Sequence, residues 1–342
     1  MWFHSRAKRN HASSQPQNNC TWFKYKRSRL GLTITSPLIE TVMPIFLLIG
    51  LGFLSRRMGV LKSGDERILS AYVYYFALPA LFFVNMVETN FMGETLRFMF
   101  AGIVPIFIAL TIYIVLYLLF GFSRKTLYLL ILCTIFGSLA FFGIPFITFA
   151  FPTRQGENLA TLSAAAIAIV SVPISITVLE LHRLGESTIG KGLKHVLKRL
   201  TKNPLVISIL SGILLSLVGT ELPLPLSTTL HMLGGTTSAV AVFMLGVFLY
   251  GRKYTNVVAA FELSLLRMIL FPIVAFLITM LFDLPDMERS VLVLMHGMPV
   301  ALSMIVLSER YDFYKETIAS LILVSSLGAG LYLNLWLLLL GY

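Results

Sequence analysis

The sequence predicts an all-α integral membrane protein of about ten transmembrane helices. Three observations predict this fold class. First, 57% of the 342 residues are hydrophobic and 13% are charged, which is far from the composition of a water-soluble domain. Second, apolar stretches of about 20 residues, the length that crosses a bilayer, recur from Pro37 almost to the last residue. Third, basic residues are concentrated in every second loop between these stretches.

The chain consists of a polar tail, ten apolar spans and one long basic loop. Residues 1–33 hold seven basic residues and no acidic one, so we expect this tail to lie outside the fold. Apolar spans follow near 36–55, 67–87, 98–121, 126–150, 160–181, 204–219, 226–250, 257–282, 289–308 and 316–341. The basic stretch 182–203 separates five spans from five, which divides the fold into residues 34–181 and 204–342.

The charges of the loops predict the orientation of the spans. Basic residues gather near 56–67, 124–125, 183–202, 252–253 and 310–315, whereas the opposite loops are mostly acidic. Because Lys and Arg accumulate on the cytoplasmic side, both chain ends are predicted outside. The basic tail contradicts this, and three explanations stay open: a true start downstream of Met1, a cleaved targeting segment, and a genuine cytosolic tail. Since each half has an odd number of spans, the second half must be inverted relative to the first.

Two spans are interrupted near the middle of the membrane. The fourth contains Gly137 to Pro145, and the ninth, its counterpart, contains His296 to Ser303. Pro removes a backbone donor and Gly permits unwinding, so unpaired peptide groups there need a cavity or a ligand. If the two breaks cross, helix N-termini bring free N–H groups to one point, which suits a carboxylate. The alternative is that Pro145 and Pro299 are only packing kinks.

Short motifs, each weak alone, occur in a defined order along the spans. They are Pro44–Gly52, Ala77–Phe82, Gly143–Pro145, Asn203–Leu205, Ala239–Gly246, Arg267 with Pro272, and Met298–Pro299. Together they resemble the bacterial branch of the auxin efflux carrier family, itself similar in fold to bile acid and sodium symporters, over about residues 36–341. The resemblance implies two inverted five-helix repeats with crossed, broken fourth and ninth helices. It also implies that the first, second, sixth and seventh helices form one bundle, which moves against the bundle of the crossed helices.

The resemblance implies a substrate site between the crossed helices, with polar side chains there and on the second and seventh helices. Matched to this sequence, the substrate-binding residues are Ser138, Gly143, Pro145, Gly297, Met298, Pro299 and Ser303, with Asn85 and Ser238. Ser138 and Ser303 stand where the family commonly has asparagine. Because serine reaches less far and offers no amide, this favours a smaller substrate or one bridged by water.

Two ionisable residues within the spans are candidates for charge or proton coupling. Arg267 lies about ten residues into the eighth span, where a charge is costly and indicates function. Three interpretations stay open: it neutralises a bound dicarboxylate, pairs with Glu262, or snorkels to the cytoplasmic edge. His296 either accepts a proton or is a neutral ring bonded to an unwound carbonyl. His231 and Glu221 are expected to be solvated near the outer surface.

The remaining features exclude other classes of protein. The net charge is +11, but its basic residues sit in short loops, which favours contact with membrane lipid and not nucleic acid. Cys20 and Cys133 support neither a disulfide framework nor a metal cluster, and no cofactor is expected. The sequence has no H-E-x-x-H motif, so an enzyme is not expected.

The resulting prediction is a multi-pass permease of the bacterial inner membrane that carries a small organic anion. Malonate or another small dicarboxylate is the first substrate class, and an indole or aromatic acid is the second. A channel or a membrane receptor for such an anion is the alternative. The sequence leaves open whether a proton or sodium is the coupling ion and whether the protein is a homodimer.

Overall fold

The computed structural model describes residues 37–184, 201–251 and 254–342. The tail 1–33 and most of the basic loop 182–203 therefore lie outside the described residues. The helices before this loop are α2 (Pro37–Arg57), α3 (Asp65–Tyr72), α4 (Leu78–Glu88), α5 (Gly93–Phe120), α6 (Arg124–Ile135), α7 (Ile144–Ala150) and α8 (Arg154–Leu184). Those after it are α10 (Pro204–Val218), α11 (Leu224–Leu249), α12 (Val257–Leu265), α13 (Phe271–Leu281), α14 (Asp286–His296), α15 (Ser303–Tyr311) and α16 (Lys315–Leu339).

The described part of the chain is helical throughout its regular structure and contains no β-strand. Within these described residues, six continuous helices are long and apolar enough to cross a membrane: 65–88, 93–120, 154–183, 224–249, 257–281 and 315–339. Their outer surfaces suit lipid. On α5, for example, Leu118 and Leu119 are each 73% exposed and Phe120 is 74% exposed. Contiguous apolar surface of this kind is rare on soluble monomers and is expected for a helix in a bilayer.

Helix boundaries follow local capping signals in the sequence. The Ser123 side chain accepts a hydrogen bond from the Thr126 N–H at the start of α6, and Asn203 does the same for Leu205 at the start of α10. Each satisfies one of the N–H groups that a first turn leaves unpaired. Gly121 and Gly219 end α5 and α10 in the left-handed conformation, with φ of 60° and 73°, which glycine adopts without steric cost.

In the part of the chain that the structure describes, three short π-helical segments interrupt the spans, and each ends two residues before a proline. They are η1 (Val73–Ala77), η2 (Leu139–Gly143) and η3 (Leu266–Leu270), which precede Pro79, Pro145 and Pro272. A proline inside a helix removes one hydrogen bond and clashes with the carbonyl one turn earlier. One extra residue in the preceding turn relieves the clash, and such bulges are frequent at functional sites.

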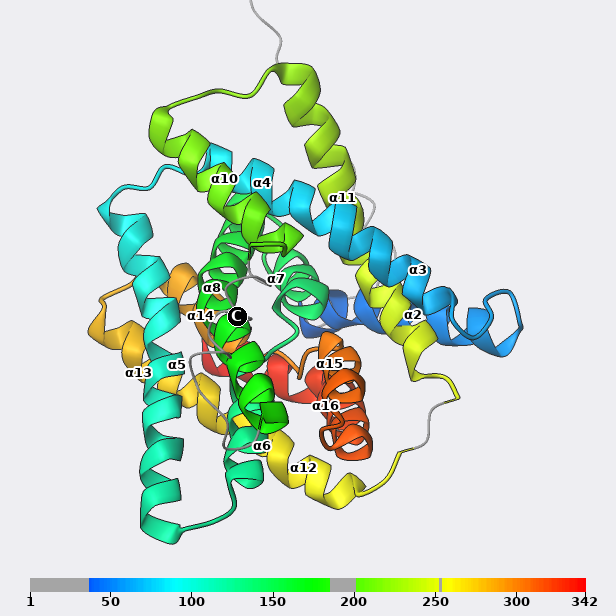
Figure 1. The fold of residues 1–342 in the computed structure, drawn as a ribbon. Coiled ribbons are helices and arrows are strands. Elements are labelled where there is room, and N and C mark those ends of the chain that lie inside the picture. The colour runs from blue at the N-terminus through cyan, green and yellow to red at the C-terminus, as the bar shows by residue number, and fades with distance from the viewer. Residues whose placement is uncertain (1–36, 185–200, 252–253) are drawn as a thin grey trace, which may run out of the picture.

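The helices pack as two groups (Figure 1). In one group, α11 packs against α2 and α4, and α10 packs against α4. In the other, α5 packs against α8 and α13, α13 against α14, and α12 against α16. The groups meet where α7 contacts α2 and α11, and where α8 contacts α4. The broken α6–α7 segment therefore contributes directly to the contact between the groups.

Glycines allow the first group to pack closely. A Cβ atom on Gly52 of α2 would collide with the backbone carbonyl of Phe243 on α11, and one on Gly246 would collide with that of Ile49. In a membrane, small residues at a crossing let two helix backbones approach and gain dispersion energy. Two of the motifs quoted above, Pro44–Gly52 and Ala239–Gly246, thus meet at one helix crossing.

Candidate functional site

The two interrupted helices meet at their breaks. Between α6 and η2, Gly137 forms an isolated antiparallel bridge with Val300, which lies between α14 and α15. The Ser138 N–H donates to the Pro299 carbonyl at 2.7 Å, and the Ala301 N–H donates to the Phe136 carbonyl at 3.0 Å. The Val300 N–H donates to Ser325 Oγ on α16 at 3.2 Å. The expectation of free N–H groups at the crossing is therefore wrong for these three residues, because two of them donate to carbonyls of the opposite break and the third donates to a side chain of α16.

Arg267 lies at the centre of this crossing. It projects from η3, is 1% exposed, and its Cζ atom lies 5.6 Å from the ring centroid of Phe271. Its Nε donates to the Met298 carbonyl and its Nη1 to the Thr134 carbonyl. Arg267 therefore does not snorkel to an edge. It donates instead to carbonyls of the two chain breaks, and Glu262 is exposed on α12.

The two carbonyls share one property, which explains why a cation binds them. Thr134 lies in the last turn of α6, and Met298 lies two residues beyond the end of α14. Carbonyls at a helix C-terminus lack the N–H of a following turn and carry the negative end of the helix dipole. A guanidinium supplies both the missing donors and the compensating charge. Gly137 makes room for it, since a Cβ atom there would fall on Arg267 Nη2.

His296 ends α14 beside Arg267. Its Nδ1 lies 2.8 Å from the Leu292 carbonyl, its Nε2 is buried without a hydrogen-bond partner, and its ring meets Phe271 edge-to-face at 4.8 Å. Since a carbonyl only accepts, Nδ1 carries the proton. The carbonyl belongs to the helical turn before His296, and not to an unwound segment as expected.

Ser138 carries a buried hydroxyl without a partner. The residue is 4% exposed, and its Oγ makes no hydrogen bond to the described residues. On α11, which packs against η2, Thr237 Oγ1 is likewise buried and unpaired. The neighbouring Ser238, which the resemblance implied, is half-buried. Buried polar atoms nearly always have partners, so an unpaired hydroxyl at a helix break is a candidate ligand-binding group.

The other predicted substrate-binding residues serve the packing of the crossing. Gly143, Pro145, Gly297, Met298 and Pro299 are all buried. A Cβ on Gly143 would lie 2.8 Å from Met295 Sδ, and one on Gly297 would lie 3.0 Å from Pro272 Cγ.

The two predicted residues that remain are Ser303 and Asn85. Ser303 begins α15 and is half-buried. Asn85 on α4 is buried, and its Nδ2 donates to Thr161 Oγ1 on α8 at 3.3 Å.

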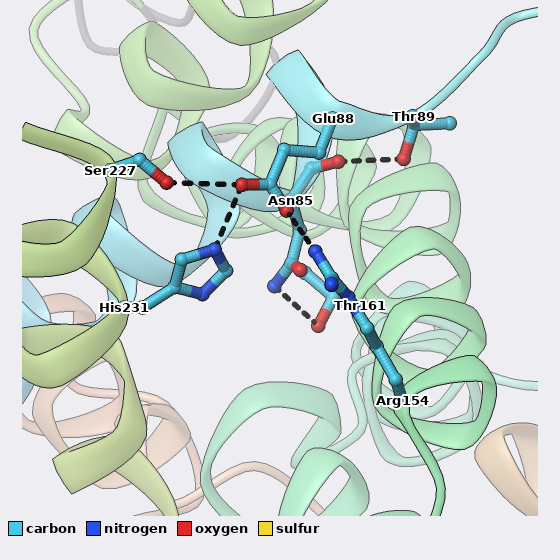
Figure 2. A network of polar contacts seen from close by, with 7 residues as sticks. All are labelled: Asn85, Glu88, Thr89, Arg154, Thr161, Ser227 and His231. Carbon is cyan, nitrogen blue, oxygen red and sulfur yellow. Dashed lines mark hydrogen bonds and ion pairs between the residues drawn. The ribbon is translucent and has the colours of Figure 1, made fainter. Parts of the chain in front are cut away.

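A polar network near Asn85 was not anticipated from the sequence (Figure 2). Glu88 at the end of α4 accepts hydrogen bonds from Arg154 of α8 at 3.1 Å and from Ser227 of α11 at 3.2 Å, and it lies 2.9 Å from His231 Nε2 of α11. His231 is therefore not simply solvated. The only available signal was topological: Glu88, Arg154 and His231 all lie toward the same predicted side of the membrane.

The same network borders a cleft of about 440 Å³. Its lining residues come from the turn after α4 and from the ends of α10 and α11: Val87, Glu88, Thr89, Asn90, Ser216, Gly219, Thr220, Glu221, Leu222 and Ser227. Ser216 Oγ donates to the Thr89 carbonyl at 2.6 Å, and Thr89 Oγ1 donates to the Asn85 carbonyl at 2.6 Å. The cleft thus lies between helices of the first group, one turn from Asn85.

Comparison with known proteins gives a consistent result. A family model described as membrane transport protein matches residues 37–337. An uncharacterized transporter of Methanocaldococcus jannaschii is 26% identical over 306 residues, covering 87% of this chain and 97% of the relative. The uncharacterized transporter YfdV of Escherichia coli is 26% identical over 308 residues, with 87% and 96% covered. A putative malonate transporter of Rhizobium meliloti is 24% identical over 309 residues, with 84% and 90% covered.

Proposed function

This chain belongs to the membrane transport protein family, that of the auxin efflux carriers, and from this premise we propose that it is a secondary transporter of a small organic anion. The proposed substrate class is a small carboxylate such as malonate. The name of the Rhizobium meliloti relative favours malonate. The protein would work by alternating access in a cell membrane, with the bacterial inner membrane and both chain ends outside as the proposed setting.

The observation that carries this proposal is the crossing itself. It combines two broken helices, a buried Ser138 hydroxyl without a partner, and the buried charge of Arg267. Within the described residues, no Asp or Glu forms an ion pair with Arg267. The formal charge of Arg267 is therefore offset only by carbonyl dipoles and not by a carboxylate, which favours an anionic guest in a medium of low dielectric.

The proposed architecture has two inverted five-helix repeats. Helices α2 to α8 would form the first and α10 to α16 the second, with α6–α7 and α14–α15 as the paired broken helices. The group of α2, α4, α10 and α11 would move against the rest. Inverted repeats that exchange roles expose a central site alternately to the two sides of a membrane. Membrane lipid is then the permanent partner, and a homodimer remains compatible with this arrangement.

The first test is transport of labelled malonate in proteoliposomes by the wild type and by Ser138→Ala. We expect saturable uptake and counterflow in the wild type. We expect a loss of about tenfold in the variant, because a hydrogen bond to a charged substrate is removed. Ser175→Ala is the matched control, since that buried hydroxyl already donates to the Ser171 carbonyl at 2.7 Å.

The outcomes separate the candidate functions. Counterflow requires a carrier that reorients with its substrate bound, so uptake without counterflow would favour an anion channel. Anion binding without any flux would favour a receptor. Equal flux in Ser138→Ala, Ser175→Ala and the wild type would place the binding site away from the crossing.

A further inference from the structure

Two backbone carbonyls at the crossing bind the same buried cationic side chain. The carbonyls of Thr134 and Met298 both accept hydrogen bonds from the Arg267 guanidinium. In transporters with broken helices, unwound carbonyls and half-helix C-terminal ends are the groups that coordinate a coupling cation such as Na⁺. Here one such carbonyl from each broken helix accepts a hydrogen bond from the positively charged side chain of Arg267. This side chain belongs to η3, the π-helical segment directly before α13.

Several features hold this side chain in place. Pro272 lacks the N–H that would otherwise bond the Met268 carbonyl, and Trp336 Nε1 of α16 donates to that carbonyl at 2.9 Å. The π-helical turn that carries Arg267 is therefore anchored to a neighbouring helix. Phe271 covers one face of the guanidinium, and Gly137 leaves the space that it fills. The position is 1% exposed, so water does not compete for the carbonyls.

We propose that Arg267 is a tethered monovalent cation, occupying the carbonyl site where a free coupling cation would otherwise bind. A tethered charge cannot dissociate on either side of a membrane. The wild-type protein therefore needs no alkali cation at this crossing, and removal of the side chain creates a vacant site for a small monovalent cation. The occupancy of the site is independent of what the protein transports, whereas the ion independence of transport rests on the proposed function.

The occupancy is tested by thermal unfolding of purified protein in detergent at constant ionic strength, with choline chloride as the reference salt. We expect Arg267→Ala to unfold at a lower temperature than the wild type. Millimolar guanidinium, which is too dilute to denature, should restore part of the loss, since a ligand that binds only the folded state stabilises it. Sodium and potassium are tested in the same way and should act less strongly, because they offer no directed N–H donors.

Two comparisons control for general effects of arginine loss. Arg289→Ala removes a partly exposed arginine that also donates to a backbone carbonyl, that of Leu284 at 3.0 Å. Neither this variant nor the wild type should gain stability from guanidinium. Gly137→Ser keeps Arg267 but places a side chain where its Nη2 lies. It should lower the unfolding temperature without any response to guanidinium.

Definite results would overturn the proposal. It fails if Arg267→Ala unfolds like the wild type, or if the folded variant responds equally to choline, guanidinium and sodium. Should Arg267→Ala not fold in any salt, a comparison of Arg267→Lys with Arg267→Met decides. Lysine keeps a tethered positive charge but has fewer directed donors, whereas methionine has a similar length and no charge. We expect the lysine variant to unfold at a higher temperature than the methionine variant, and a methionine variant as stable as the lysine variant would contradict the proposal.

Transport measurements are the second test of the proposal. Malonate flux in wild-type proteoliposomes should be equal in sodium, potassium and choline media. Flux through Arg267→Ala should fall about tenfold or more, since two charge-assisted hydrogen bonds are lost, and guanidinium should restore it. A sodium requirement in the wild type would overturn the proposal even if malonate is carried. Absence of flux for every anion would instead contradict the proposed function and leave the unfolding results unaffected.

Discussion

Buried polar residues in this protein differ in how fully their hydrogen bonds are satisfied. Arg267 donates to two carbonyls, whereas the hydroxyls of Ser138, Thr237 and Tyr332 are buried and have no partner among the residues that the structure describes. Glu88 represents a third situation, because its side chain is 28% exposed and accepts bonds from two other helices. In hydrocarbon each unsatisfied group is costly. Groups left unsatisfied near a helix break are therefore the residues on which a functional experiment should act.

At this scale we predict the effect of Glu88→Gln. The substitution removes the charge that Arg154 contacts, but Arg154 is 78% exposed, so the expected loss of stability is only about 1 kcal/mol or less. Because the pair is exposed, the difference from the wild type should disappear in high salt. Thermal unfolding in detergent at low and high ionic strength checks this. Glu221→Gln, which removes another carboxylate of the same cleft, should have no effect at either salt concentration.

The contradicting outcome for Glu88 is equally specific. A loss of several kcal/mol, unchanged by salt, would mean that Glu88 is a buried structural anion. The bond between Glu88 and Arg154 would then not be a weak contact between the two helix groups. The distinction matters because a contact that forms and breaks during alternating access has to be weak.

At the scale of elements, prolines determine where helices change their hydrogen-bonding pattern. The segments η1, η2 and η3 each lie directly before a proline-containing turn. In the eighth span the carbonyl that Pro272 leaves unpaired belongs to Met268, and Trp336 bonds it from α16. Trp336 is therefore half-buried against another helix, and its indole N–H makes a structural hydrogen bond.

We predict that Trp336→Phe destabilises the protein by about 1–3 kcal/mol, because a buried carbonyl loses its donor. The same substitution should cost less in a Pro272→Ala background, since alanine supplies an N–H one turn after Met268. A double-mutant cycle of unfolding free energies measures this coupling. Tyr332→Phe on the same helix is the control and should be neutral, because its hydroxyl has no partner among the described residues. Additive effects of the two substitutions would contradict the assigned hydrogen bond.

At the scale of the whole molecule, two helix groups meet along a limited set of contacts. The contacts between α8 and α4 include the Asn85–Thr161 bond in the interior and the Glu88–Arg154 pair nearer the surface. Both couple the same two helices, about one turn apart along α4. If the groups move against each other as proposed, these bonds cannot persist through the whole cycle.

A short cross-link between these helices should therefore stop transport. We predict that Glu88→Cys with Arg154→Cys, joined by a short bis-thiosulfonate reagent that forms a disulfide with each cysteine, loses malonate counterflow and regains it when a reductant cleaves those disulfides. Ser227→Cys with Glu88→Cys joins α11 to α4 within one group and is the control, so its counterflow should survive. Counterflow that continues through the cross-linked Glu88–Arg154 pair would show that the two groups do not separate there.

The fold could be predicted from sequence to the extent that it depends on local pattern. The all-helical, membrane-spanning class, the interruptions at Gly137–Pro145 and His296–Ser303, and the family could all be predicted from residue order, whereas the number of ten spans stays a prediction. The length of an apolar span is matched to the thickness of the bilayer, and a proline interrupts the helix in which it lies. Neither effect depends on residues that are distant in the sequence. The predicted interruption of the fourth span contains η2, although the sequence did not indicate a π-helical turn, and η1 and η3 were not predicted.

The pairing of distant residues could not be predicted in this way. The sequence allowed Arg267 a substrate, a carboxylate or the membrane edge, and the structure places it on the carbonyls of Thr134 and Met298. Likewise, Glu88, Arg154 and His231 read separately as loop charges and a solvated ring. The physical reason is that hydrogen bonds and ion pairs require contact within a few ångströms. Only the packing of helices far apart in sequence brings those atoms together, whereas membrane insertion and helix interruption are properties that each segment has by itself.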